Sequence, residues 1–169
     1  MKQLTKFLFL PIVMFAFTVS TFAQVSETAT ATATIVSPIL ITKSLDMNFG
    51  NVAVGTTAGT VVMTPASARS ATGGVTLPAT IGTVSAATFN VTGTAGYTYT
   101  IAIAGDPLTV TSGVNTMTVT TFTNSPTSPA TLVAGDNALT VGATLNVGAS
   151  QAAGLYVSAS TFSVTVNYN

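Results

Sequence analysis

Hydrophobic and polar residues alternate with a period of two along much of the chain, and helical periodicity is absent beyond the N-terminal segment. Residues 28–35 read TATATATI, which places threonine on one face and alanine or isoleucine on the other. Residues 97–103, 139–147 and 162–168 continue this pattern with larger side chains. Successive side chains of a strand point to opposite sides of a sheet, so these segments are expected to be half-buried β-strands.

Short turn-forming clusters separate the alternating segments. They contain Gly, Pro, Asn and Asp, at residues 73–74, 105–107, 124–126 and 135–137. These residues favour turns, and the abundant Thr and Val suit a pleated, half-buried surface. The pattern predicts an all-β protein: an immunoglobulin-like antiparallel β-sandwich of about seven to nine strands.

One strand is expected to contain an irregularity. Met117 and Val119 alternate with threonines, but Thr120 and Thr121 shift the phase of the pattern before Phe122. An extra residue of this kind is typical of a β-bulge.

The N-terminal 23 residues have the layout of a secretory signal peptide. Lys2 and Lys6 precede an apolar run at residues 7–19, and small residues follow at positions 21 and 23. The run is shorter than the roughly 20 apolar residues that span a bilayer, so we expect no membrane span. We therefore expect residues 1–23 to be removed near Ala23, and residues 24–169 to form one secreted β-sandwich domain, extracellular or on the outer cell surface.

The remaining sequence offers little reactive chemistry. The chain contains no His, Cys or Trp, and only 5% of its residues are charged. Catalysis and metal binding need titratable side chains held close together, so we expect no enzyme activity, no metal and no cofactor. Clustered Lys and Arg are also missing, which argues against nucleic acid as a partner. The charges beyond the signal segment are Glu27, Lys43, Asp46, Arg69, Asp106 and Asp136.

Two kinds of charged residue leave alternatives open. Asp106 and Asp136 lie in turn sequences and are expected to bond nearby backbone N–H groups, although folding could gather carboxylates into a Ca²⁺ site. Arg69 is either a solvated or locally paired charge, or a contact for a carboxylate or glycan.

The segment at residues 28–36 has two interpretations. In the preferred one it is the first strand of the domain's own sandwich. In the other it is an N-terminal arm that adds to an exposed sheet edge of a neighbouring molecule. The side chains that would enter a partner in the second case are Ala29, Ala31, Ala33, Ile35, Ile39 and Ile41.

Several ordered segments resemble the secreted bacterial family called domain of unknown function 4402. The segments are residues 45–50 (LDMNFG), 73–75, 89–93 (FNVTG), 97–101, 117–119, 147–156 and 162–168. The family name implies no activity and therefore supplies no catalytic residues.

A second resemblance is to the spore-coat-U-type pilins of archaic chaperone–usher pili. It is carried by the arm, by the L-x-x-x-F-G of residues 45–50, by residues 154–156 (GLY) and by the alternating terminal strand. This resemblance implies an incomplete immunoglobulin-like sandwich, which the N-terminal arm of the next subunit completes. Two features differ from the group, because this chain lacks cysteine and its arm is rich in alanine.

The sequence therefore predicts a non-catalytic, exported structural or adhesive cell-surface protein. A specific version of this prediction is a fimbrial-type subunit that assembles through its N-terminal strand. Its partners would be other copies of itself or other cell-surface subunits. The alternative is a soluble secreted module that binds carbohydrate or protein. Its stacking candidates are Tyr97, Tyr99, Tyr156 and Tyr168, of which the first two are expected in the core.

Overall fold

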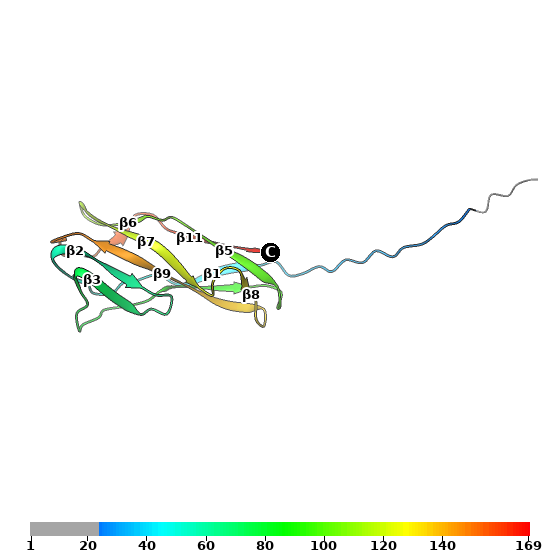
Figure 1. The fold of residues 1–169 in the computed structure, drawn as a ribbon, viewed down its shortest axis with the longest axis horizontal. Coiled ribbons are helices and arrows are strands. Elements are labelled where there is room, and N and C mark those ends of the chain that lie inside the picture. Colours follow the sequence, from blue (N-terminus) through cyan, green and yellow to red (C-terminus); the bar gives the residue numbers. More distant parts are fainter. Residues whose placement is uncertain (1–23) are drawn as a thin grey trace, which may run out of the picture. The chain divides into compact units, whose positions relative to one another are not determined.

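All the regular secondary structure that the computed structural model describes is β-strand, and residues 24–169 are the described part of the chain (Figure 1). The strands are β1 (Leu40–Leu45), β2 (Ala53–Met63), β3 (Arg69–Thr76), β4 (Ala87–Thr92), β5 (Thr98–Ala104), β6 (Leu108–Ser112), β7 (Asn115–Ser125), β8 (Ala130–Thr131), β9 (Asp136–Val147), β10 (Val157–Ser158) and β11 (Ser163–Tyr168). The all-β expectation is confirmed. There are eleven strands rather than seven to nine, and β8 and β10 contain only two residues each.

The expected signal segment, residues 1–23, lies outside the described residues. The described part contains no helix that is long and apolar enough to cross a membrane. The chain divides into two units, Met1–Thr34 and Ile35–Asn169, and all eleven strands belong to the second unit.

The segment at residues 28–36 is not the first strand of the domain. Residues 24–39 carry no strand, and the first strand of the sheet is β1, which pairs with β4. This corrects the preferred interpretation of the sequence. The physical reason lies in the side chains, because the methyl groups of Ala29, Ala31 and Ala33 bury too little apolar area to offset the entropy lost on ordering the segment.

Every strand pair in the two sheets is antiparallel, and β9 organises the larger sheet. The first part of β9 pairs with β4, from Thr92↔Asp136 to Ala87↔Val141, and the second part pairs with β2 up to Gly59↔Val147. On its other side β9 pairs with β7, which is followed by β6 and β10. The smaller sheet has the order β11-β5-β8.

The two sheets face each other over only part of their area. One core cluster joins β4 and the first part of β9 to all three strands of the smaller sheet: Val91, Tyr99, Ala130, Leu132, Leu139 and Val166. The other cluster comes from the larger sheet alone: Val61, Val75, Leu108, Val119, Ala143, Leu145 and Val147. Irregular segments, not strands of the smaller sheet, therefore cover the second cluster.

The expected bulge in β7 is confirmed. The register between β7 and β9 shifts between Thr120 and Thr123, and Thr121 has a positive φ of 55°. The Asp106 carboxylate accepts a hydrogen bond from the backbone N–H of Thr121 at 2.9 Å. Asp106 thus stabilises a bulge fifteen residues away, in addition to lying in its own turn.

Candidate functional site

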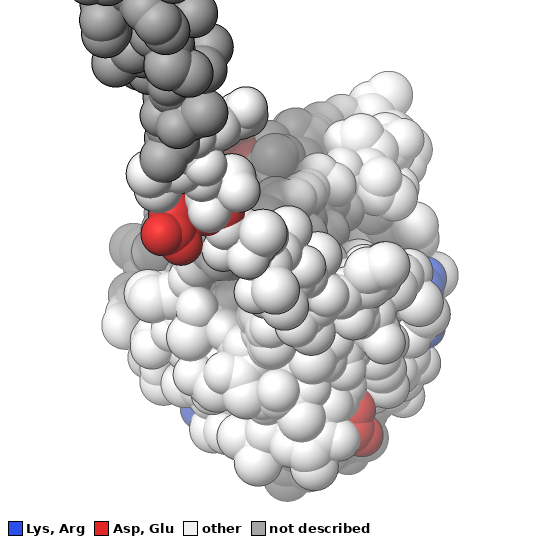
Figure 2. All heavy atoms as spheres, turned by 90° about the vertical axis from the view of Figure 1, so that its right-hand side faces the viewer, with Lys and Arg blue, Asp and Glu red and all other residues white. Residues whose placement is uncertain are grey.

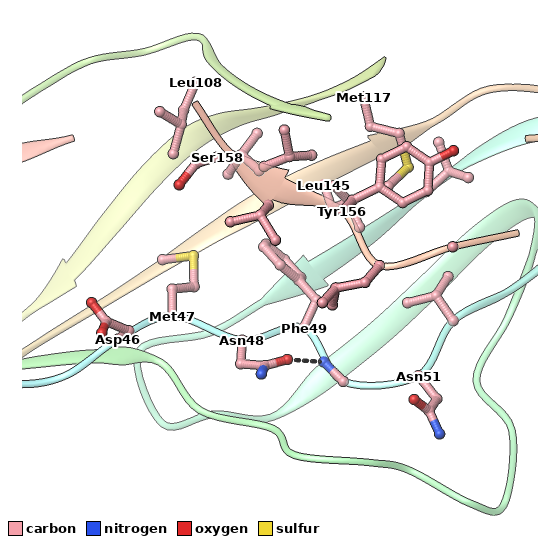
Figure 3. A pocket seen from close by; sticks show the side chains of 18 of the residues that line it. Asp46, Met47, Asn48, Phe49, Asn51, Leu108, Met117, Leu145, Tyr156 and Ser158 are labelled. Carbon is pink, nitrogen blue, oxygen red and sulfur yellow. Dashed lines mark hydrogen bonds between the residues drawn. The ribbon is translucent and has the colours of Figure 1, made fainter. Parts of the chain in front are cut away.

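An apolar groove of about 1000 Å³ lies where the smaller sheet does not cover the larger one (Figure 3). Its floor is the inner face of β6, β7 and β9, formed by Leu108, Val110, Met117, Val119, Leu145 and Val147. Period-two alternation places these side chains on one face of the sheet, so the floor follows directly from the sequence. Such a face normally packs against a second layer.

The groove is long enough to compare with a strand. Phe89 lines one part of it and pairs with Leu139 of β9, whereas Val147, which also lines it, lies eight residues further along β9. Eight residues of extended strand span about 27 Å. The residues that line the groove therefore extend over about 27 Å along the direction of β9.

The first rim is the segment between β1 and β2. Met47 and Phe49 point into the groove, and Asn48 between them pairs with Ser85 through two backbone hydrogen bonds of 2.8 and 3.0 Å (Figure 3). The first rim is thus a short extended segment. Its backbone pairs with Ser85, and its apolar side chains lie over the floor of the groove.

Arg69 holds the end of this rim. Its Nη1 donates hydrogen bonds to the backbone carbonyls of Phe49 and, at 3.0 Å, Asn51. The turn between these carbonyls needs glycine, because Gly50 has a φ of +67° and a Cβ there would lie 2.3 Å from the Ile81 carbonyl oxygen. Arg69 is therefore a locally paired charge that fixes the rim, as one of the two sequence interpretations expected.

The second rim is the segment around β10. Tyr156 lines the groove, and its hydroxyl donates to the Ala152 carbonyl at 2.8 Å and accepts from Gln151 Nε2 at 2.8 Å. Gln151 also donates to the Thr116 carbonyl of β7, so side-chain bonds tie this rim to the floor. Only Val157 and Ser158 of the rim pair with a strand, namely β6.

Phe162 closes the groove where the chain crosses to the smaller sheet. Its ring lies 6.3 Å from that of Phe89 and 4.9 Å from that of Phe122. It is followed by β11, which pairs with β5 on one side and has no strand partner on its other side among the described residues. The groove therefore ends where β11 begins.

The structure separates the six residues expected to form an assembly strand into two groups. Ala29, Ala31 and Ala33 are exposed and belong to no strand, and Ile35 is 97% exposed. Ile39 and Ile41 instead pack against the core shared by the two sheets of their own domain. Ile39 and Ile41 are therefore part of the folded domain, and only residues up to 36 remain outside its strands and core.

The four tyrosines do not form a shared stacking surface. Tyr99 is fully buried, as expected. Tyr97 was expected in the core but is 42% exposed, with its ring 5.7 Å from that of Tyr168. It lies in a turn before β5, where the alternating pattern does not yet fix which face is buried. Tyr156 and Tyr168 are only partly exposed and use their hydroxyls in hydrogen bonds.

Charged side chains are few and scattered on the face seen in Figure 2. Lys43 and Asp46 pair with each other at 2.7 Å beside the groove, with exposed side-chain fractions of 56% and 80%. Within residues 24–169, no group of three carboxylate, His or Cys side chains is placed to hold a metal ion. Lys43 and Asp46 are the charged residues among those of the described chain that line the groove.

Comparison with curated proteins and with solved structures gave no match. The model of one protein family matches residues 39–168, which include every strand of both sheets and both rims of the groove. The chain thus belongs to the family described as Domain of unknown function (DUF4402).

Proposed function

We propose that this protein is a non-catalytic, exported structural or adhesive subunit of the cell surface. In this proposal the arm of one copy, residues 28–36, enters the groove of another copy. The observation that carries the proposal is the apolar groove over β6, β7 and β9, which the smaller sheet does not cover, in a chain whose N-terminal arm has the alternation of a strand but belongs to none.

The arm and the groove agree in length. Residues 28–36 span about 27 Å when extended, which matches the extent of the groove's lining along the direction of β9. Alternation places Ala29, Ala31, Ala33 and Ile35 on one face of the arm, toward the floor, and the threonines on the other. An added strand of this kind gains backbone hydrogen bonds from a free edge and burial from alternate side chains.

The arm leaves the domain at the end opposite the groove. The backbone at Ser37 is held by two hydrogen bonds, because its N–H donates to Thr94 Oγ1 at 2.9 Å and its carbonyl accepts from the Tyr168 hydroxyl at 3.0 Å. Tyr168 ends β11, whereas Phe162, at the groove, precedes that strand. Figure 1 shows β8 and the C-terminus at one end of the Ile35–Asn169 unit, with β6 and β2 toward the other.

This placement favours open-ended assembly. A contact between one surface of a subunit and a different surface of the next is heterologous, and such contacts form filaments unless the rotation closes a ring. An arm inserted from a neighbour would run antiparallel to β11. An arm folded back into its own groove would run parallel to β11 and leave the protein a monomer.

The composition and the resemblances support the same proposal. A chain with so few ionisable groups is suited to a structural role, and residues 1–23 are expected to direct export. The chain also resembles spore-coat-U-type pilins, and in those pilins the arm of the next subunit completes the sandwich.

The test uses two matched substitutions in the arm, Ala31→Asp and Thr30→Asp. Each adds one carboxylate, but position 31 faces the groove and position 30 faces away. An unpaired charge is costly to bury, so Ala31→Asp should abolish assembly and Thr30→Asp should leave most of it. The readout is the ladder of high-mass species from cell-surface extracts, run in detergent gels without heating and again after heating.

Three outcomes decide the matter. A heat-sensitive ladder that is lost only in Ala31→Asp supports the proposal. A wild-type protein that is monomeric throughout contradicts it, and glycan-array binding by that monomer would favour the alternative of a soluble carbohydrate- or protein-binding module. If Thr30→Asp and Ala31→Asp fail equally, the arm does not act as a strand.

A further inference from the structure

We propose that consecutive copies also pack end to end, through two exposed apolar patches at opposite ends of the domain. This inference rests on the proposed function. It adds a contact between folded domains that the arm alone does not provide, and it identifies the partner of both patches as a second copy of this chain.

The first patch surrounds the point where the arm leaves the domain, and we call it the root patch. It consists of Ile35, Tyr97 and Val133, which are 97%, 42% and 69% exposed. Backbone hydrogen bonds between residues 97 and 132, and the contact of Tyr97 with Tyr168, bring these side chains to the same end as the arm's origin.

The second patch surrounds the open end of the groove, and we call it the mouth patch. It consists of Val114, Leu155 and Val157, which are 96%, 82% and 56% exposed. Val157 pairs with Thr111 of β6, and a Cβ on Gly154 would lie 2.5 Å from Ser112 Oγ, so this rim lies beside the β6–β7 turn that carries Val114. Leu155 and Val157 also line the groove itself.

The length of the arm brings the two patches together. If residues 28–35 fill the groove, Ile35 lies at its mouth and only Val36 separates it from Ser37, which is fixed on the donor domain. Two residues span at most about 7 Å. The donor's root patch must therefore lie against the acceptor's mouth patch, with no room for a flexible linker.

The charges near the patches are compatible with this contact. Asp136 borders the root patch, where its N–H donates to the Val133 carbonyl at 3.3 Å. None of Lys43, Asp46, Arg69 and Asp106 belongs to the mouth patch. The contact is therefore driven by apolar burial, and exposed apolar side chains gathered around such a site are a usual mark of a protein interface.

Crosslinking between single cysteines tests the contact. The natural chain contains no cysteine, so Val133→Cys and Val114→Cys each introduce the only thiol. Both positions are exposed, and the substitutions should leave folding intact. Filaments grown from a mixture of the two variants should form a disulfide-linked or short-linker dimer, which neither variant forms alone. A mixture of Val133→Cys with Leu45→Cys, exposed on β1 away from both patches, is the control and should give no dimer.

The outcomes separate this inference from the proposed function. The mixed dimer, lost when Ala31→Asp is added, supports the end-to-end contact. A normal heat-sensitive ladder without the mixed dimer overturns the contact and leaves arm insertion standing. Dimers from Val133→Cys alone would mean a symmetric contact and also overturn the inference. Without any ladder in the wild type, both ideas fail.

Discussion

Replacing Arg69 with methionine should destabilise the domain more than its place near the surface suggests. Arg69 is half-buried, and its guanidinium donates to two carbonyls that flank the Gly50 turn. Methionine keeps much of the length and apolar contact of the side chain and removes both donors. The substitution therefore isolates the hydrogen bonds that fix the first rim.

The expected cost follows from the geometry. A hydrogen bond to a charged group contributes about 1.5–3 kcal/mol, and water can replace part of it at a half-buried site. We therefore expect a loss of about 2 kcal/mol for the pair, which lowers Tm by roughly 4–8 °C in a domain of this size. Thermal unfolding followed by circular dichroism or calorimetry measures this shift.

Lys43→Met is the matched control. It removes the other cation of the folded domain, but Lys43 forms only an exposed ion pair with Asp46. Such pairs contribute about 0–1 kcal/mol, so its Tm should change little. If Arg69→Met and Lys43→Met give the same Tm, the two carbonyl contacts do not stabilise the rim and the reasoning is wrong.

Two further matched pairs of substitutions test the Gly50 turn and the origin of the arm. In denaturant unfolding, Gly50→Ala should be much more destabilising than Gly113→Ala. Both glycines have positive φ, but a Cβ at Gly50 meets the Ile81 carbonyl, whereas nothing lies within 4 Å of a Cβ at Gly113. Equal losses of stability would contradict the clash. Tyr168→Phe removes a hydroxyl that bonds both Ser37, at the arm's origin, and the backbone N–H of Thr94, and it should cost about 1–3 kcal/mol. Tyr97→Phe, with no hydroxyl bond among the described residues, should be nearly neutral.

The sequence was sufficient to predict the strands that form the floor of the groove. Alternation in residues 139–147 placed five side chains on one face, and all five are buried in the structure. The bulge near Thr121 was visible for the same reason, since one extra residue inverts the phase of the pattern.

The sequence could not predict which strands lack a covering layer. Alternation reports that one face of a strand is apolar, but it does not say what packs on that face. Met47 and Phe49 look like part of an ordinary strand in the sequence, and only the fold shows them as a rim above a floor that the smaller sheet does not cover. The role of Arg69 was hidden for a similar reason, because its partners are backbone carbonyls that no side-chain pattern identifies.

The alanines of the arm bear directly on how strongly it would bind. In the proposed assembly each alanine presents one methyl group to a groove of about 1000 Å³, so most of the affinity would come from backbone pairing. Ala31→Leu adds three carbon atoms to the buried face, at about 0.8 kcal/mol for each, and should strengthen binding by about 2 kcal/mol, roughly 30-fold. The assay is the affinity of a peptide of residues 24–36 for the chain that lacks them. Thr30→Leu adds side-chain bulk on the outward face and should have little effect. A weaker Ala31→Leu peptide would mean that the groove narrows around the arm and that alanine is required for fit.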